Sequence, residues 1–337
     1  MASTIKDSPD RPFTSGAIDS GSAFWESYIA SRPSPPESFF RIIQTYHRGH
    51  GSHRTSVAHD VGTGPGNIAR RLLPYFDYVV GSDLNADALA VARKLTQAEH
   101  TERMAFIKSS AEELLAAPVP EIARPGDTDL VLVSECMPLL DAPKALTVFE
   151  KMLRPGGTLA IYFYGRPIFL GDNAAECNGL WARLADCVVQ CFHPFKGTPS
   201  YSSYHRSAIT LHSWLDNIEL PKQSWKQVER IRWNPDWPLR FCGLAGYDFE
   251  LEVVDRTQDG ESKRVFDHDF WTQEMSAQQV SGYLSSVLPG YRDRPNAAGR
   301  LAEIDVLLQR LQEVMGGERA TRKVTFPVSL ILAKKRE

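Results

Sequence analysis

The stretch HDVGTGPGN, residues 59–67, determines how the rest of this chain is interpreted. It lies between an apolar run at 57–61 and a helical pattern that starts near Ile68. Gly62, Gly64 and Gly66 carry no side chain, so a ligand could approach the backbone closely between strand and helix. A glycine triplet alone also fits an ordinary strand-to-helix turn, so its setting carries more weight than the glycines themselves.

An acidic residue strengthens the case for a nucleotide-type cofactor. The next apolar run, residues 78–82, ends at Asp83, about 20 residues beyond the loop, where a carboxylate can accept hydrogen bonds from both hydroxyls of a ribose. Nucleotide-dependent dehydrogenases share this arrangement, but their loop reads Gly-x-Gly-x-x-Gly, whereas here Gly66 follows Gly64 after one residue. This spacing, with Asp60 before the loop, favours S-adenosylmethionine (SAM) over NAD. The chain lacks a Gly-Lys-Ser/Thr phosphate-binding sequence, which argues against ATP or GTP hydrolysis.

Strands and helices alternate along residues 56–164. The strands are predicted at 57–61, 78–82, 105–108, 128–134 and 158–164, with helices at 68–75, 86–95, 111–115 and 142–153 between them. Such alternation predicts an α/β fold, in which helices cover both faces of a parallel sheet. Further strands are predicted at 226–233, 247–255 and 323–334, and further helices at 178–192, 209–217 and 298–315.

The chain length suits one Rossmann-like domain with insertions. We expect a disordered tail at 1–22, an N-terminal helical cap at 23–55 and a cofactor-binding core at 56–165. A lid insertion at 166–225 follows, and residues 226–337 supply the remaining core strands, a second helical insertion and the closing strand. Prolines at 33, 35 and 36 are expected to divide the cap into two helices.

Composition excludes several classes of partner. The formal net charge of −3, from 38 basic and 41 acidic residues, offers no sustained positive field for nucleic acid. The apolar runs are strand-sized and too short to span a membrane. Five irregularly spaced cysteines do not form the pattern of a disulfide framework. We therefore expect a soluble cytoplasmic protein, as a monomer or homodimer, without a nucleic-acid or membrane partner.

In order along residues 56–164, these motifs resemble the class I SAM-dependent methyltransferases. The resemblance implies a Rossmann-like, seven-stranded, mostly parallel sheet whose last strand runs antiparallel. It also implies that residues 60–66 contact the methionine part of SAM and that Asp83 holds the ribose. The stretch IKSSAE, residues 107–112, is similar to the family's adenine-contacting turn, with Ser110 where an Asp is usual. The runs 129–134 and LRPGGTL, residues 153–159, resemble the fourth strand and the turn into the fifth.

Within the class, Tyr28-x-x-x-Arg32-Pro33 and the Tyr-Phe-Tyr run at 162–164 look similar to the trans-aconitate methyltransferase-like branch, which esterifies carboxylates. Residues 137–141 depart from that branch's usual His-Trp pair, so its substrate is not carried over. Arg32 could pair with the methionine carboxylate or an acidic substrate, or be an exposed helix end. The residues expected to bind the cofactor are Tyr28, Arg32, Asp60, Gly62, Thr63, Gly64, Gly66, Asp83, Leu84, Ser110, Ala111, Glu112 and Ser134.

Methyl transfer from a sulfonium is an in-line displacement, so the protein mainly positions the nucleophile and excludes water. A carboxylate or thiolate acceptor needs no base, whereas a phenol or alcohol benefits from one. The candidates for a base are His193, His205 and Glu135, although a lone His in an aromatic loop is more often structural. Tyr164, Trp181 and Tyr201 are candidates for substrate contact. Cys187, Cys191 and His193 lack a fourth ligand, so no metal is expected.

Three functions remain in competition on the sequence. The leading one is methyl transfer from SAM to a small metabolite of secondary metabolism, at a carboxylate or hydroxyl oxygen. The second is an enzyme of natural-product biosynthesis that binds SAM but catalyses a rearrangement or cyclisation, and it stays open because no residue is obligatory for methyl transfer. The third is a non-catalytic SAM-binding regulator, against which the intact glycine loop and Asp83 argue.

Overall fold

A computed structural model describes residues 22–49, 54–198 and 200–337. The predicted tail at 1–22 therefore lies outside the described residues, apart from Ser22, where helix α1 begins. None of the helices in these ranges is long and apolar enough to cross a lipid bilayer.

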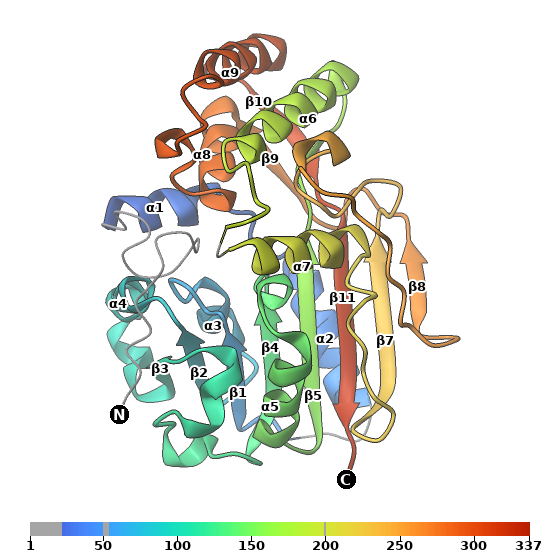
Figure 1. The fold of residues 1–337 in the computed structure, drawn as a ribbon. Helices are drawn as coiled ribbons and strands as arrows, with labels where there is room; N and C mark the ends of the chain where they lie inside the picture. The colour runs from blue at the N-terminus through green and yellow to red at the C-terminus, as the bar shows by residue number, and fades with distance from the viewer. Residues whose placement is uncertain (1–21, 50–53, 199) are drawn as a thin grey trace.

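The described residues contain an eight-stranded sheet in the order β3-β2-β1-β4-β5-β11-β7-β8 (Figure 1). Its strands are β1 (Val57–Val61), β2 (Tyr78–Asp83), β3 (Met104–Lys108), β4 (Thr128–Ser134), β5 (Leu153–Tyr164), β7 (Trp225–Trp233), β8 (Ser262–Val265) and β11 (Val328–Lys335). Strands β1 to β5 pair in parallel, and β11 runs antiparallel to both β5 and β7. The predicted α/β fold is confirmed, with its antiparallel last strand. The sheet has one strand beyond the seven expected, β8, at its edge.

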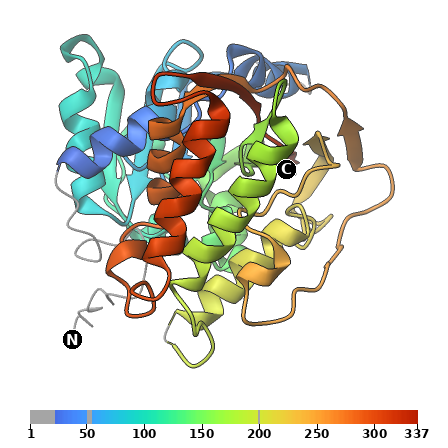
Figure 2. The ribbon, with the colours of Figure 1, turned by 90° about the horizontal axis from the view of Figure 1, so that it is seen from above.

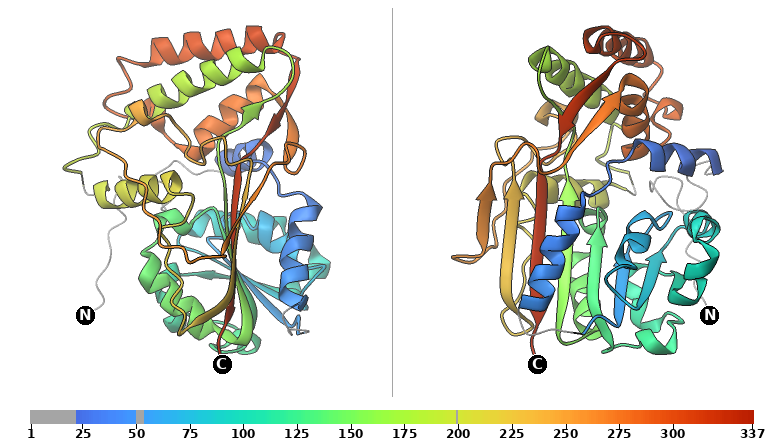
Figure 3. Two further views of the ribbon diagram at one scale, coloured as in Figure 1. Left: turned by 90° about the vertical axis from the view of Figure 1, so that its right-hand side faces the viewer. Right: turned by 180° about the vertical axis from the view of Figure 1, so that it is seen from behind.

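Helices cover both faces of this sheet, and alternation along the strands explains why. Helix α2 (Glu37–Gly49) packs on one face with the even-numbered residues of β4 and β5, such as Leu132 and Tyr162. Helix α5 (Ala142–Met152) packs on the other face with the odd-numbered residues, such as Val133 and Ile161. Figure 1 shows α5 in front and α2 behind, and Figure 3 shows the reverse view. Buried strands whose two faces both meet helices read as continuous apolar runs.

Two more α-helices and a set of short 3₁₀ helices occur along the chain. They are α3 (Asn67–Leu72), α4 (Ala86–Leu95), and the short 3₁₀ helices η1 (Ala98–Arg103), η2 (Ala111–Ala116), η3 (Glu121–Ala123), η4 (Met137–Leu139), η5 (Leu244–Gly246) and η6 (Tyr291–Asp293). Helix α4 begins at a strong cap, because the Asn85 side chain accepts hydrogen bonds from the backbone N–H groups of Asp87 and Ala88. The cap fixes the chain directly after β2, next to Asp83.

A second, upper layer lies above the carboxyl ends of the parallel strands (Figures 1 and 2). It comprises a three-stranded sheet, β6-β10-β9, and three helices. Its elements are β6 (Ile168–Phe169), β9 (Thr272–Ser276), β10 (Thr321–Thr325), α6 (Ala174–Gln190), α8 (Ala277–Val287) and α9 (Leu301–Met315). Helix α7 (Tyr201–His212) lies lower, against η4 at the end of β4. The predicted lid segment thus provides β6, α6 and α7.

Helix α1 (Ser22–Ser31) joins the upper layer to the core. It packs mainly on α8 and also contacts α4. A Cβ atom at Gly282 would lie 2.1 Å from the Ser31 Oγ and 3.0 Å from the Ser31 Cβ, so glycine at this position favours the close approach of α1 and α8. The proline-containing break at residues 32–36 separates α1 from α2, as predicted.

Two predicted elements were wrong. No strand forms at 247–255, where Tyr247 and Phe249 pack their rings together instead of joining a ladder. The predicted helix at 209–217 begins at Tyr201 and ends at His212, because Trp214 and Leu215 have positive φ angles of 56° and 67°.

The predicted closing strand at 323–334 is split into β10 and β11, which belong to different sheets. The break falls at residues 326–327, where Pro327 has no N–H to donate to a ladder. The chain thereby passes from the upper layer into the centre of the main sheet.

Candidate active site

The glycine loop turns the chain from β1 into α3 at the carboxyl edge of the sheet. Gly62, Gly64 and Gly66 have φ angles of +70°, +53° and +76°, a region that favours glycine. A Cβ atom at Gly62 would lie 2.4 Å from the Cys136 Sγ, so this glycine is also required by close packing. At Gly64, by contrast, an added Cβ would meet no atom within 4 Å. The loop therefore has open space beside Gly64, which suits a ligand against the backbone.

Asp60 holds this loop in place. Its Oδ2 accepts a hydrogen bond from the Thr63 hydroxyl at 2.7 Å, and its Oδ1 accepts one from the Ser134 hydroxyl at 3.1 Å. The side chain is fully buried, and burial raises the pKa of Asp60 to about 7. Asp60 therefore links the loop to the end of β4.

Asp83, at the end of β2, is the acidic partner of the loop. Its Oδ2 accepts a hydrogen bond from the Gly64 N–H and its Oδ1 accepts one from the Asn85 N–H, both at 2.8 Å. Burial raises the pKa of Asp83, and these two hydrogen bonds partly offset that effect. Each oxygen keeps further lone-pair capacity, so the carboxylate can also accept from ligand hydroxyls. Leu84, beside it, is exposed.

The segment predicted to contact adenine forms η2. Ala111 is buried, while Ser110 donates a hydrogen bond to the Glu113 carboxylate at 3.2 Å. The Glu112 Oε1 accepts a hydrogen bond from the Asp141 N–H at 3.0 Å, which ties η2 to the start of α5. These three predicted residues lie after β3, the neighbour of β2.

Glu135 follows β4 directly and has an unusual conformation. Its φ of 61° lies in the left-handed region, which is costly for a residue with a side chain. Its Oε1 accepts a hydrogen bond from the Tyr164 N–H at 2.8 Å. Its Oε2 is buried, has no hydrogen-bond partner, and lies 3.8 Å from the Arg32 Nη1. The Glu135 Oε2 can therefore still accept a hydrogen bond.

Arg32 brings the N-terminal segment to the same place. Its Nη1 donates to the Tyr164 hydroxyl and its Nη2 donates to the Ser286 carbonyl, both at 3.1 Å. The guanidinium also lies 4.9 Å from the Tyr28 ring centre and 5.5 Å from that of Tyr283. Such cation–π contacts stabilise a partly desolvated charge. Arg32 is therefore a buried part of the site and not an exposed helix end.

The pKa of Glu135 differs from that of an acidic residue on the protein surface. Burial raises the pKa of Glu135 well above its usual value, and the nearby Arg32 charge only partly offsets this. Burial also raises the pKa of Tyr164. A raised pKa makes the ionised carboxylate a stronger base toward a proton of a bound group.

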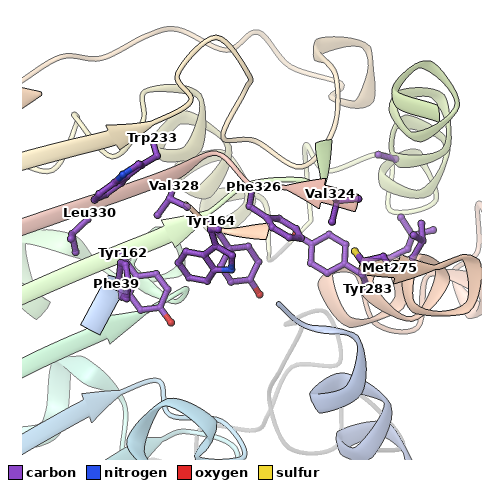
Figure 4. Close-up of a cluster of buried hydrophobic side chains, with 14 of the residues drawn as sticks. Phe39, Tyr162, Tyr164, Trp233, Met275, Tyr283, Val324, Phe326, Val328 and Leu330 are labelled. Carbon is purple, nitrogen blue, oxygen red and sulfur yellow. The ribbon is translucent and has the colours of Figure 1, made fainter. Parts of the chain in front are cut away.

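A row of aromatic rings extends from this cluster into the upper layer (Figure 4). Tyr164 lies 5.7 Å from Phe326 and 6.5 Å from Tyr283, centre to centre. Trp181, fully buried on α6, lies 5.8 Å from Tyr283 and 5.6 Å from Phe241. The Trp181 Nε1 is buried without a hydrogen-bond partner. Tyr164 and Trp181, both predicted to contact substrate, are thus linked through Tyr283.

The two histidine candidates lie elsewhere. The His193 Nε2, in a loop of the lid segment, lies 3.0 Å from the carbonyl oxygen of Gly246 in η5. His205 packs between Tyr201 and Phe249, with ring centres 5.3 Å and 5.0 Å away. Of the three proposed bases, Glu135 is the one that contacts Tyr164 and Arg32, near the glycine loop.

The cysteines are all free thiols among the described residues. Cys187 and Cys191 are buried in the hydrophobic core around α6. Within the part of the chain that the structure describes, no three His, Cys, Asp or Glu side chains gather as a metal site would require.

Three residues at the site were not among the site residues predicted from the sequence. Cys136 fills the space over Gly62, Tyr283 lies beside Arg32, and Trp271 packs 5.4 Å from Tyr164. Cys136 adjoins Glu135, so its position after β4 could have suggested it. Tyr283 and Trp271 are more than a hundred positions from Tyr164, and no local pattern marks them.

Comparison with known proteins agrees with this geometry. A family model described as "Methyltransferase domain" matches residues 58–157. The chain is 49% identical over 331 residues to methyltransferase ptaI of Pestalotiopsis fici, covering 97% of each chain. It is 35% identical over 319 residues to methyltransferase pgmE of Aspergillus terreus, covering 92% of each. A solved candidate type II methyltransferase from Anaeromyxobacter dehalogenans has the same fold, with a TM-score of 0.54, 17% identity, and coverage of 90% of this chain and 97% of that one. The chain therefore belongs to the class I SAM-dependent methyltransferases.

Proposed function

We propose that the enzyme transfers the methyl group of SAM to a hydroxyl or carboxylate oxygen of a small aromatic metabolite. The observation that carries the proposal is Glu135, whose buried Oε2 has no hydrogen-bond partner and lies beside Arg32 and Tyr164. The aromatic row that leads away from this group supports an aromatic acceptor.

The residues around the glycine loop fit SAM. Asp83 would accept hydrogen bonds from the ribose hydroxyls, and the open space beside Gly64 would receive the methionine part against the backbone. Leu84 and the segment 110–112 would flank the adenine. Arg32, whose Nε is buried without a hydrogen-bond partner, would face the methionine carboxylate together with Tyr28. When bound, SAM supplies a methyl group already activated by a sulfonium.

The chain itself would position the acceptor and handle its proton. An ionised Glu135 accepts the proton of an acceptor hydroxyl through its Oε2, and Arg32 at 3.8 Å stabilises the ionised form. An acceptor carboxylate arrives without a proton and does not need Glu135. The buried rings of Tyr164 and Trp271 exclude water from the reacting oxygen.

Turnover with a mixed panel of acceptors tests the proposal. The purified protein is incubated with SAM and phenols, aromatic acids, thiols or amines, and products are identified by a mass gain of one CH₂ unit together with S-adenosylhomocysteine. Mild base then cleaves a methyl ester but not a methyl ether, which separates the two kinds of oxygen. Products methylated only on nitrogen, sulfur or carbon would contradict the proposal, as would conversion of an acceptor without S-adenosylhomocysteine.

Glu135→Gln separates the role of the carboxylate from a structural one. Gln keeps an oxygen that can accept from the Tyr164 N–H but cannot take up a proton. We expect kcat for a hydroxyl acceptor to fall about a hundredfold, with the pH profile flattened. Methylation of a carboxylate acceptor should change little. Glu303→Gln, at an exposed position of α9, is the matched control.

A further inference from the structure

Two arginines lie close together just beyond the aromatic row. Arg166 follows Tyr164 by two residues, and Arg240 lies in the loop after β7. The two segments are in direct contact, because a Cβ atom at Gly165 would lie 2.8 Å from the Leu239 carbonyl oxygen. Arg166 and Arg240 are called the arginine pair below.

Nearby carboxylates do not fully balance the positive charge of the arginine pair. Burial lowers the pKa of Arg166, and the charge of Arg240 lowers it further. Guanidinium groups nevertheless stay protonated in proteins, so two like charges act on each other in a partly buried place. The Nε atoms of both arginines are buried and have no hydrogen-bond partner.

The nearest polar groups leave one charge unbalanced. Asp186 on α6 is the carboxylate that acts on both arginines, but its Oδ1 already accepts from the Gly243 N–H at 2.6 Å. The His212 Nδ1 lies 3.3 Å from the Arg240 Nη1. Burial and Arg240 both lower the pKa of His212, which keeps that ring neutral. Two positive charges therefore meet one negative charge.

The position of the pair relates it to the acceptor. Phe241, next to Arg240, packs 5.6 Å from Trp181 and 6.2 Å from Tyr283, centre to centre. Tyr283 in turn packs against Tyr164, beside Glu135. The arginine pair therefore adjoins the aromatic row through neighbouring residues: Phe241 follows Arg240, and Gly165, before Arg166, accepts a hydrogen bond from the Tyr283 hydroxyl at 3.1 Å.

We propose that the arginine pair binds an ionised carboxylate of the acceptor, separate from the oxygen that is methylated. A planar carboxylate matches the fork of guanidinium N–H groups, balances the excess charge and satisfies the unpartnered Nε atoms. This inference rests on the proposed function. It makes the acceptor an aromatic acid, held at its acidic end in the upper layer while another oxygen reaches the methyl group.

A binding experiment without turnover tests the inference. The full chain, saturated with S-adenosylhomocysteine at constant ionic strength, is titrated with benzoate and salicylate, each beside its neutral methyl ester. We expect each acid to bind about tenfold to a hundredfold more tightly than its ester, as for hydrogen bonds to a charged group. Arg166→Gln and Arg240→Gln should bring the acid to the level of the ester. Arg206→Gln, at an exposed position of α7, should keep the preference.

Each possible result is decisive. Equal binding of acid and ester by the wild type overturns the inference without any variant, so a variant that fails to fold does not obscure the answer. A preference for the acid that persists in both Gln variants overturns it as well. Loss of S-adenosylhomocysteine affinity in Arg166→Gln would assign the pair to the cofactor instead. Because no methyl transfer is measured, failure here is distinct from failure of the proposed function, which appears only in the turnover panel.

Discussion

The site has two halves: the cofactor edge, formed by β1, the glycine loop and Asp83, and the proposed acceptor side, formed by Glu135, Tyr164 and the aromatic row beyond them. The two halves are built differently. At the cofactor edge, Asp60 and Asp83 make their hydrogen bonds mostly to residues within 19 positions, through Thr63 and Gly64. On the proposed acceptor side, contacts join residues far apart in the chain, such as the Tyr283 hydroxyl and the Gly165 carbonyl, 118 positions apart. The cofactor edge is therefore a local motif, and the acceptor side is assembled by the whole fold.

The halves also differ in how completely their polar atoms are paired. At the cofactor edge, Asp83 has a backbone N–H on each oxygen, although the His59 Nδ1 is buried without a hydrogen-bond partner. The proposed acceptor side holds more such atoms: the Glu135 Oε2 and the nitrogens of Arg166 (Nε), Trp181 (Nε1), Arg240 (Nε) and Trp271 (Nε1). Buried polar atoms are normally paired, so each of these atoms can still form a hydrogen bond with a ligand. Under the proposed function, the acceptor side therefore keeps more hydrogen-bonding capacity for a ligand than the cofactor edge does.

The largest effect should come from removing the acidic partner of the loop. Asp83→Ala removes the acceptor for the Gly64 N–H and the proposed acceptor for the ribose hydroxyls. We expect SAM affinity, measured by isothermal titration, to fall about a hundredfold or more, since hydrogen bonds to a charged group contribute about 1.5–3 kcal/mol each. Asp77→Ala, at an exposed site, should bind normally. Unchanged affinity in Asp83→Ala would remove the distinction between the two halves.

Alanine substitutions at two glycines of the loop should change different properties: stability at Gly62 and SAM affinity at Gly64. Gly62→Ala places a Cβ atom 2.4 Å from the Cys136 Sγ, whereas Gly64→Ala meets no protein atom within 4 Å. Both variants incur a left-handed strain of about 1–2 kcal/mol. Gly62→Ala should therefore lose about 1–3 kcal/mol more stability in chemical denaturation, as overpacking does. Gly64→Ala should fold well but bind SAM poorly. Equal losses of stability in both would contradict the open space beside Gly64.

Acid should destabilise the cofactor edge through His59. This side chain is fully buried in β1, its Nε2 lies 2.8 Å from the Ser82 Oγ, and burial lowers its pKa to about 3. The unfolded chain, with a histidine pKa near 6.5, takes up this proton first, so stability falls as pH drops from about 6.5 toward 3, by up to about 1.4 kcal/mol per pH unit.

The variant His59→Gln checks this slope. Urea unfolding at a series of pH values should show a smaller loss in the variant than in the wild type. The loss that remains comes in part from His47, whose pKa burial lowers to about 4. His268→Gln, at an exposed position, should match the wild type. Parallel slopes in wild type and His59→Gln would show that His59 does not resist protonation in the folded state.

The smallest effect should appear on the acceptor side. Trp181→Phe keeps an aromatic ring on α6 but loses the unpartnered Nε1 and part of the contact with Phe241 and Tyr283. We expect KM for the acceptor to rise about threefold to tenfold, the range of roughly 1 kcal/mol of lost contact, with SAM affinity unchanged. Trp225→Phe, a buried change on β7, is the matched control. An equal rise of KM in both variants would argue against a role of Trp181 in the acceptor site.

How much could be predicted from sequence follows the same division. The glycine loop, Asp83 and the parallel strands were accessible because their signals are local: glycine spacing, an acid at a strand end, and alternating apolar runs. Glu135 was accessible as the residue directly after a predicted strand. Tyr283 and Arg240 were not, because only the fold brings them to Tyr164 and Arg166.

The wrong elements have the same origin. The apolar and aromatic residues at 247–251 look like a strand, but their side chains pack with other rings and no backbone ladder forms. The last predicted strand is split at Pro327. Its two parts join different sheets, which the sequence pattern does not indicate. Periodicity predicts that a segment is buried; it does not predict which sheet buries it.

The contact between Arg32 and Ser286 has a consequence for how the protein is made. The two residues are 254 positions apart, so on the ribosome α1 emerges long before α8, its main packing partner. At about 5–20 residues per second, that interval is on the order of tens of seconds. During this time helix α1 lacks the surface of α8 against which it packs in the folded protein. The N-terminal helix of the nascent chain therefore reaches its final packing only after most of the chain has been made.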